Sequence, residues 1–250
     1  VLGNHEGETA ALLDGSADNV AVWATTARKA LFPNPEPDSF YAGDGSNQAL
    51  VGRRESVYAW EWGDALFVVL DPYWFTSTRP GQGDNWTRTM GSAQAAWLEE
   101  VLARSHARFK LVFIHSLVGG LDKDGRGGAE AARFFEWGGR NADGSWGFGA
   151  RRPGWARPIH EVLVANGVDV VFHGHDHLFA RQELDGIVYQ EVPQPGWPGL
   201  VLQNPAEYGY TSGTFLPSSG FLRVTVKPTS LCVEYVRAYL PRDETAERDN

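Results

Sequence analysis

Four of the seven histidines stand where apolar runs of the sequence end. His115 ends the run 109–114, His173 and His175 end the run 168–172, and His177 lies just beyond. Ligands of an open α/β sheet bind outside the carboxyl ends of its strands, so side chains that follow separate strands can converge there. Because imidazole binds zinc, iron and manganese-type ions, this pattern indicates a metal site at one edge of a sheet. A single histidine in such a place is more often a hydrogen-bonded structural residue, and we interpret His106 and His160 in that way.

The elements that must position these histidines follow from the apolar pattern. Helices are expected at 20–31, 92–105 and 156–166, with Ser92 as a cap and Gly167 as a left-handed C-terminal residue. The last two helices each lead into an apolar run, which is typical of a layered α/β sheet. Residues 58–71 indicate a hairpin that leads into a buried strand, and 221–226 with 231–239 indicate a second hairpin.

Composition narrows the class of protein. A chain of 250 residues, of which 42% are hydrophobic, is long enough for one large domain with its own core. Its 22 basic and 31 acidic residues give a net charge of −9, so it lacks the basic surface of a nucleic-acid binder. The longest apolar run, 65–70, is too short to span a bilayer. The single cysteine, Cys232, excludes an internal disulfide framework and a cysteine-rich zinc cluster.

Three motifs in order resemble those of the calcineurin-like metallophosphoesterase superfamily, above all its purple acid phosphatase-like members. They are Gly-Asn-His-Glu at 3–6, the histidine at 115 and Gly-His-Asp-His at 174–177. Supporting similarity runs through 58–71, 94–99 and 167–177, so the resemblance covers 1–192. It implies a four-layer αββα sandwich of two mixed β-sheets flanked by helices. A single domain is expected at 1–240, followed by a charged tail at 241–250.

The resemblance also implies a centre of two metal ions of the iron, zinc or manganese type. Asn4, His115 and His175 correspond to ligands of the second metal, and His177 corresponds to a ligand of the first. His173 matches no ligand of the family, and we interpret it as a supporting or structural residue. Asp176, between two ligand histidines, is not expected to be a ligand.

Catalysis is implied in the same way. His5 corresponds to the histidine that contacts substrate phosphate and protonates the leaving group, with Glu6 orienting its ring. The implied reaction is metal-dependent hydrolysis of a phosphate ester, whether a small molecule or a polymer. Two adjacent cations suit that reaction because they activate water and stabilise the in-line transition state.

The chain departs from the family pattern at its start. The superfamily carries Asp-x-His and Gly-Asp-x-x-Asp motifs before Gly-Asn-His, and they complete the first metal site and supply the bridging carboxylate. No residues here match them, because the chain begins at that third motif. We therefore expect a fragment without its N-terminal strands, which holds the second metal weakly and is inactive alone.

Two other interpretations stay open. A non-catalytic binding protein on the same sandwich would use tryptophan-rich loops for a glycan or protein ligand. An unrelated histidine-rich α/β protein would leave Asn4 and the three histidines scattered more than about 10 Å apart, too far for shared metal ligation. The tryptophans concerned are Trp60, Trp62, Trp74, Trp86, Trp137, Trp146, Trp155 and Trp197.

Overall fold

The apolar runs of the sequence form neighbouring parallel strands in the computed structural model, which describes residues 1–79, 81–196, 202 and 204–248. These strands are β3 (Ala65–Val69), β4 (Phe109–Phe113) and β5 (Val170–His173), and β7 (Ile187–Glu191) extends the parallel set beyond β5. Runs of β-branched and aromatic residues suit strands that are covered on both faces, which is the usual position of parallel strands. The predicted buried strands are confirmed.

Antiparallel strands complete the sheet on both sides. β2 (Tyr58–Trp62) pairs with β3 across the Gly63–Asp64 turn, as the sequence predicts, and β1 (Ala42–Gly43) lies outside it. At the other edge lie β6 (Phe179–Leu184) and β8 (Thr214–Leu216). The eight-stranded mixed sheet has the order β1-β2-β3-β4-β5-β7-β6-β8.

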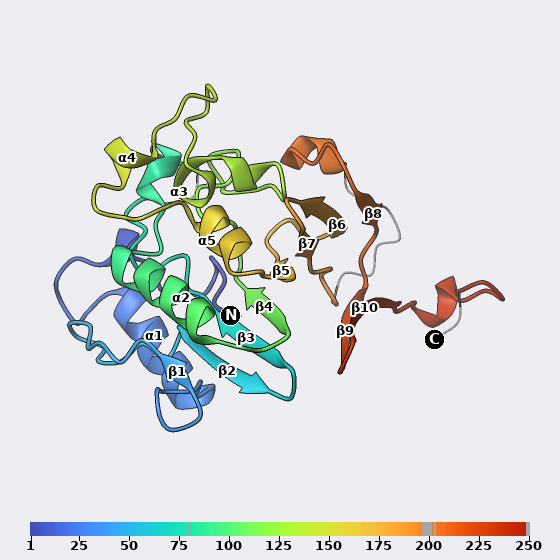
Figure 1. Ribbon diagram of the computed structural model, residues 1–250, viewed down its shortest axis with the longest axis horizontal. Helices are drawn as coiled ribbons and strands as arrows, with labels where there is room; N and C mark the ends of the chain where they lie inside the picture. The colour runs from blue at the N-terminus through green and yellow to red at the C-terminus, as the bar shows by residue number, and fades with distance from the viewer. Residues whose placement is uncertain (80, 197–201, 203, 249–250) are drawn as a thin grey trace.

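Helices cover one face of this sheet. Figure 1 shows α2 (Ser92–Arg104) and α5 (Ile159–Ala165) lying side by side across it. Their apolar side chains form the main core with the strands, as the fully buried set Leu66, Val68, Leu98, Leu102, Val112, Leu163 and Val171 illustrates. The remaining helices are α1 (Val20–Leu31), α3 (Phe135–Gly138) and α4 (Phe148–Arg151), with 3-10 turns at Ala10–Leu12, Asn85–Thr87, Ala131–Arg133, Pro205–Tyr208 and Pro241–Asp243. No helix in the described part of the chain is long and apolar enough to cross a membrane.

Two helix ends differ from the expectation. α2 is capped by Gly91, whose φ is 83°, and Ser92 is already its first residue. α5 begins three residues late, at Ile159, since Pro158 precedes it in an extended conformation. Proline cannot donate a backbone hydrogen bond, and it favours the start of a helix over its interior. The left-handed residue expected at Gly167 is confirmed, with φ 63°.

A hairpin of β9 (Gly220–Lys227) and β10 (Ser230–Arg237) packs on the opposite face of the large sheet. Its aliphatic side chains meet an aromatic row that includes Phe67, Phe113 and Phe172. The predicted α/β sandwich is confirmed, and its smaller sheet is a two-stranded antiparallel one within the described residues. After β10 the chain extends away from the body (Figure 1), and positions 249–250 of the expected tail lie outside the described residues.

The tryptophans of the described residues are divided between the interior and the surface. Trp74, Trp86 and Trp137 are buried, whereas Trp62 and Trp146 are exposed. Trp197 lies outside the described residues. This distribution gives no support to a tryptophan-lined binding surface.

Candidate functional site

Three of the predicted metal ligands come together beside the carboxyl ends of β4 and β5. The Oδ1 atom of Asn4 lies 3.0 Å from Nε2 of His115, and Nδ1 of His175 lies 3.3 Å from that same nitrogen. His115 follows β4, His175 follows β5, and Asn4 arrives on the loop that opens the chain. The arrangement differs from the scattered one expected of an unrelated histidine-rich protein.

The other two predicted histidines, His5 and His177, line a cavity together with Asn4 and His175. It encloses about 220 Å³, and His5 and His177 contribute exposed side chains to its wall. The carboxylate of Glu6 accepts a hydrogen bond from the backbone N–H of Gly3 at 2.8 Å. Glu6 therefore closes the turn that carries Asn4 and His5.

The backbone geometry explains why glycine stands at position 3, and it places two of the histidines in unusual conformations. A Cβ atom on Gly3 would lie 2.9 Å from the Glu6 carboxylate and 3.0 Å from the His115 ring, so a larger residue would push the imidazole aside. His175 and His177 have φ of 90° and 60°, in the region that residues other than glycine rarely adopt. Such conformations cluster at functional sites, because the surrounding structure must hold them in place.

The imidazoles of this cluster are uncharged at neutral pH. Burial, together with the neighbouring imidazoles of His175, His177, His5 and His173, lowers the pKa of His115 to about 3. Burial also lowers the pKa of His175, against the opposing charge of Asp176. Neutral imidazole is the form that binds a metal ion, so both rings are prepared for ligation.

A backbone carbonyl sets the tautomer of His175. Nε2 of this ring lies 3.0 Å from the carbonyl oxygen of Asp124, which can only accept a hydrogen bond. The proton therefore resides on Nε2, and the lone pair of Nδ1 faces His115. Metal-binding histidines in proteins are commonly oriented by such a contact.

Asp176 is among the residues that line the cavity, whereas His173 is buried and does not line it. His173 Nδ1 is 2.6 Å from a carboxylate oxygen of Glu191, and both side chains are buried. Asp176 accepts hydrogen bonds from Gly127 N–H at 2.9 Å and from the Tyr210 hydroxyl at 2.8 Å. Burial and the nearby Glu191 raise the pKa of Asp176 to about 6. Both residues support the site through other groups.

Carboxylate ligands are scarce in the centre. Within the residues that the structure describes, no group of three or more His, Cys, Asp or Glu side chains lies close enough to hold a metal ion. The cluster consists instead of two imidazoles and one amide. A second ion, with His177 among its ligands, stays a prediction.

Sequence reasoning missed three residues of the cavity wall: Asp124, Arg126 and Tyr208. Asp124 and Arg126 belong to the glycine-rich insertion that follows β4, in the stretch Asp-Gly-Arg-Gly-Gly at 124–128. A long glycine-rich loop in a compact domain is often functional, which was the available signal. It did not show which of its side chains would face the histidines.

Comparison with known proteins gives a distant likeness. No protein-family model matches the chain, and no curated protein matches its sequence. Among solved structures, it is similar to a purple acid phosphatase isolated from yellow lupin (Lupinus luteus) seeds, with 16% identity and a TM-score of 0.45. The match covers 94% of this chain and 37% of the lupin chain, so this chain spans well under half of that protein's length. Any functional conclusion must therefore rest on the site itself.

Proposed function

We propose that the cavity holds a metal ion on Asn4, His115 and His175 and hydrolyses a phosphate ester. One observation carries the proposal. Side chains from three segments, far apart in the sequence, place an amide oxygen at 3.0 Å and an imidazole nitrogen at 3.3 Å from Nε2 of His115. His115 Nε2 lies within hydrogen-bond distance of both other atoms, and a bound ion would take the place of its proton.

The donor set fits a metal ion. With bonds of about 2.1 Å at angles of about 90–110°, neighbouring ligand atoms of one ion lie about 3.0–3.4 Å apart. The separations of His115 Nε2 from Asn4 and His175 fall in this range. Two imidazoles and an amide suit zinc, iron and manganese alike, so the identity of the ion is not determined by its ligands.

The residues around the ion supply the remaining chemistry. When bound, a metal ion polarises a phosphoryl oxygen and makes water a better nucleophile. His5 reaches the same cavity from the adjacent loop, and its side chain is exposed to solvent. We propose that protonated His5 donates to the leaving oxygen of the ester. The orientation of its ring by Glu6 stays a prediction.

The backbone carbonyl of Asp124 orients the ring of His175 for metal binding. By accepting the Nε2 proton of His175, it prevents the ring from rotating and from donating toward the ion. The site therefore begins with its ligand atoms aligned, which reduces the cost of binding.

Metal binding by single-site variants tests the proposal. Zn²⁺ or Mn²⁺ binding to the chain is measured by calorimetry for the wild type and for His115→Gln, His175→Gln and His106→Gln. His106 is an exposed histidine at the end of α2, away from the carboxyl ends of the strands, and serves as the matched control. We expect binding that the first two variants lose and the control keeps.

Hydrolysis of a chromogenic aryl phosphate by the wild type and the same variants completes the test. Turnover should rise with bound metal and disappear in His115→Gln. Equal metal binding by all variants would refute the site. Site-specific binding without turnover would refute the hydrolase and favour the non-catalytic binding protein.

A further inference from the structure

We propose that Arg126 is an anion-binding residue of the cavity, placed to contact the phosphoryl oxygens of a substrate. The assignment of a phosphoryl group as the natural ligand rests on the function proposed above. The anion site itself rests on the surroundings of Arg126, which can be tested without a metal ion.

The guanidinium of Arg126 faces the histidines and has unused donors. Its side chain lines the cavity together with His5, His175 and His177, and it is 38% exposed. The nearest carboxylate oxygens, of Asp122 and Asp124, lie 3.8 and 3.7 Å from its Nη1 atom. Charge-assisted hydrogen bonds are about 2.7–2.9 Å long, so both contacts are long-range attractions. Within the described part of the chain, we find no protein group that accepts a hydrogen bond from this guanidinium.

An aromatic ring supports one face of the guanidinium. Cζ of Arg126 lies 4.7 Å from the ring centroid of Tyr208, which also lines the cavity. A cation over a ring is attracted by its π electrons and keeps the N–H groups in its own plane available. Tyr208 therefore restrains Arg126 without using its hydrogen bonds.

The backbone on both sides of Arg126 is fixed. Asp122 Oδ1 accepts the backbone N–H groups of Asp124 and Arg126 at 2.9 and 3.0 Å, and the Arg126 carbonyl accepts from Leu121 at 2.7 Å. On the other side, the N–H of Gly127 donates to the buried carboxylate of Asp176. An arginine held in this way loses little conformational entropy on binding a ligand.

An oxyanion suits this arrangement better than other ligands. Guanidinium offers paired N–H donors whose spacing matches two oxygens of a phosphate or carboxylate. The rest of the wall presents the imidazoles of His5, His175 and His177 and the carboxylates of Asp124 and Asp176, and the latter already accepts hydrogen bonds from Gly127 and Tyr210. A bound phosphoryl group can exchange the two long contacts of Arg126 for short charge-assisted hydrogen bonds.

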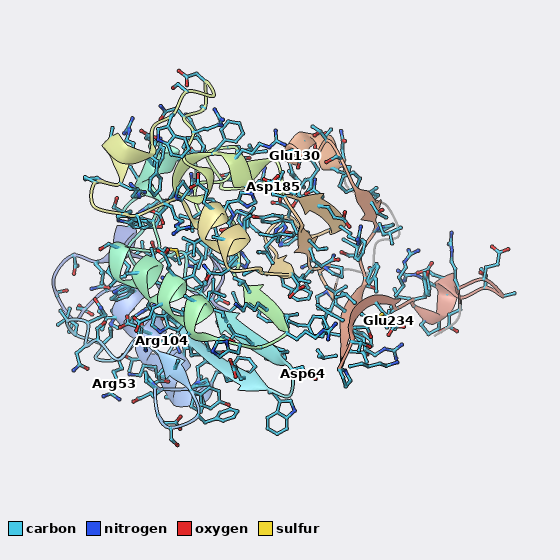
Figure 2. All side chains as sticks on the ribbon, viewed as in Figure 1. Arg53, Asp64, Arg104, Glu130, Asp185 and Glu234 are labelled. Carbon is cyan, nitrogen blue, oxygen red and sulfur yellow. The ribbon has the colours of Figure 1, made fainter. Side chains whose placement is uncertain are left out.

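Binding of inorganic phosphate to the metal-free chain at low salt tests the inference by calorimetry. Arg126→Gln should weaken phosphate binding by about tenfold or more, since the positive charge and the paired N–H donors are both lost. Arg126→Lys should show a smaller loss, because it retains charge without the paired donors. Arg104→Gln is the control with the same change of net charge. It lies at the carboxyl end of α2, which leads into the start of β4 and not its end (Figure 2).

The outcomes separate this inference from the proposed function. A loss specific to Arg126→Gln supports the anion site, even if the chain binds no metal and the proposed function fails. Three results would overturn the inference: no phosphate binding by the wild type, unchanged binding in Arg126→Gln, or an equal loss in Arg104→Gln. Thermal melts of both variants should match the wild type, because both side chains are substantially exposed.

Discussion

Replacing Glu8 with glutamine should destabilise the protein far more than the loss of one ion pair suggests. Glu8 is 1% exposed and accepts hydrogen bonds from Arg28 at 2.6 Å, Arg54 at 2.8 Å and the Thr25 hydroxyl at 2.9 Å. Arg54 also pairs with buried Asp71, so two cations and two anions balance inside the protein. Glu8→Gln keeps the shape of the side chain and leaves two buried guanidiniums with one carboxylate.

The size of the effect follows from that imbalance. Breaking a buried ion pair by removing one partner costs about 3–5 kcal/mol, because the remaining charge has lost its solvation without compensation. This is a large share of the roughly 5–15 kcal/mol that stabilises a typical domain. For a chain of this length, each kcal/mol lowers Tm by about 2–4 °C, so a fall of about 6–20 °C is expected.

Glu36→Gln provides the matched control. Glu36 pairs with Arg53 at 2.8 Å, but both side chains are almost half exposed, and such pairs contribute about 0–1 kcal/mol. Calorimetric melts and urea titrations of the two variants make the comparison. A shift for Glu8→Gln as small as that of the control would refute the argument that burial makes this charge indispensable.

Two further predictions concern buried polar side chains, Tyr189 in the main core and Asp176 at the cavity. The hydroxyl of Tyr189 lies 3.1 Å from the indole nitrogen of Trp137 and 2.7 Å from Nδ1 of His160. Tyr189→Phe should therefore lower the free energy of unfolding, measured by urea titration, by about 1–3 kcal/mol, because both nitrogens lose their partner. The second concerns pH: the folded state binds the Asp176 proton up to about pH 6 and the unfolded state only to about 3.8. The wild type should therefore lose stability relative to Asp176→Asn as pH rises from about 4 to 6, with no further change above that range. A stability difference between the two proteins that is independent of pH would contradict this assignment.

The central strands and main helices were predictable because their sequence patterns are local. α1 occupies the predicted residues Val20–Leu31, and the runs that became β3, β4 and β5 are continuous apolar stretches. The hairpin of β6 and β7 was missed although its signal was present. Asp185 and Gly186 have φ of 50° and 84°, the geometry of the turn for which Asp-Gly is a strong signature.

The cavity wall was less predictable because its contacts join distant segments. Nothing near Arg126 in the sequence indicates that it would face His175, which follows a strand about fifty residues later. The tryptophans illustrate the same limit. Trp137 was among the candidates for a ligand-binding loop, yet it is fully buried and donates a hydrogen bond to Tyr189.

Two buried carboxylates, Glu8 and Asp176, link the stability of this protein to the geometry of its site. Glu8 lies four residues after Asn4 and fixes the opening loop to α1, while Asp176 fixes the loop of Arg126 from between two site histidines. Each carboxylate contacts the backbone or the charges that position a site residue, and neither contacts a ligand atom of the proposed metal centre. Glu8→Gln should therefore weaken metal binding at temperatures well below its Tm, whereas an equally destabilising change in the helical core should leave binding intact until the protein unfolds.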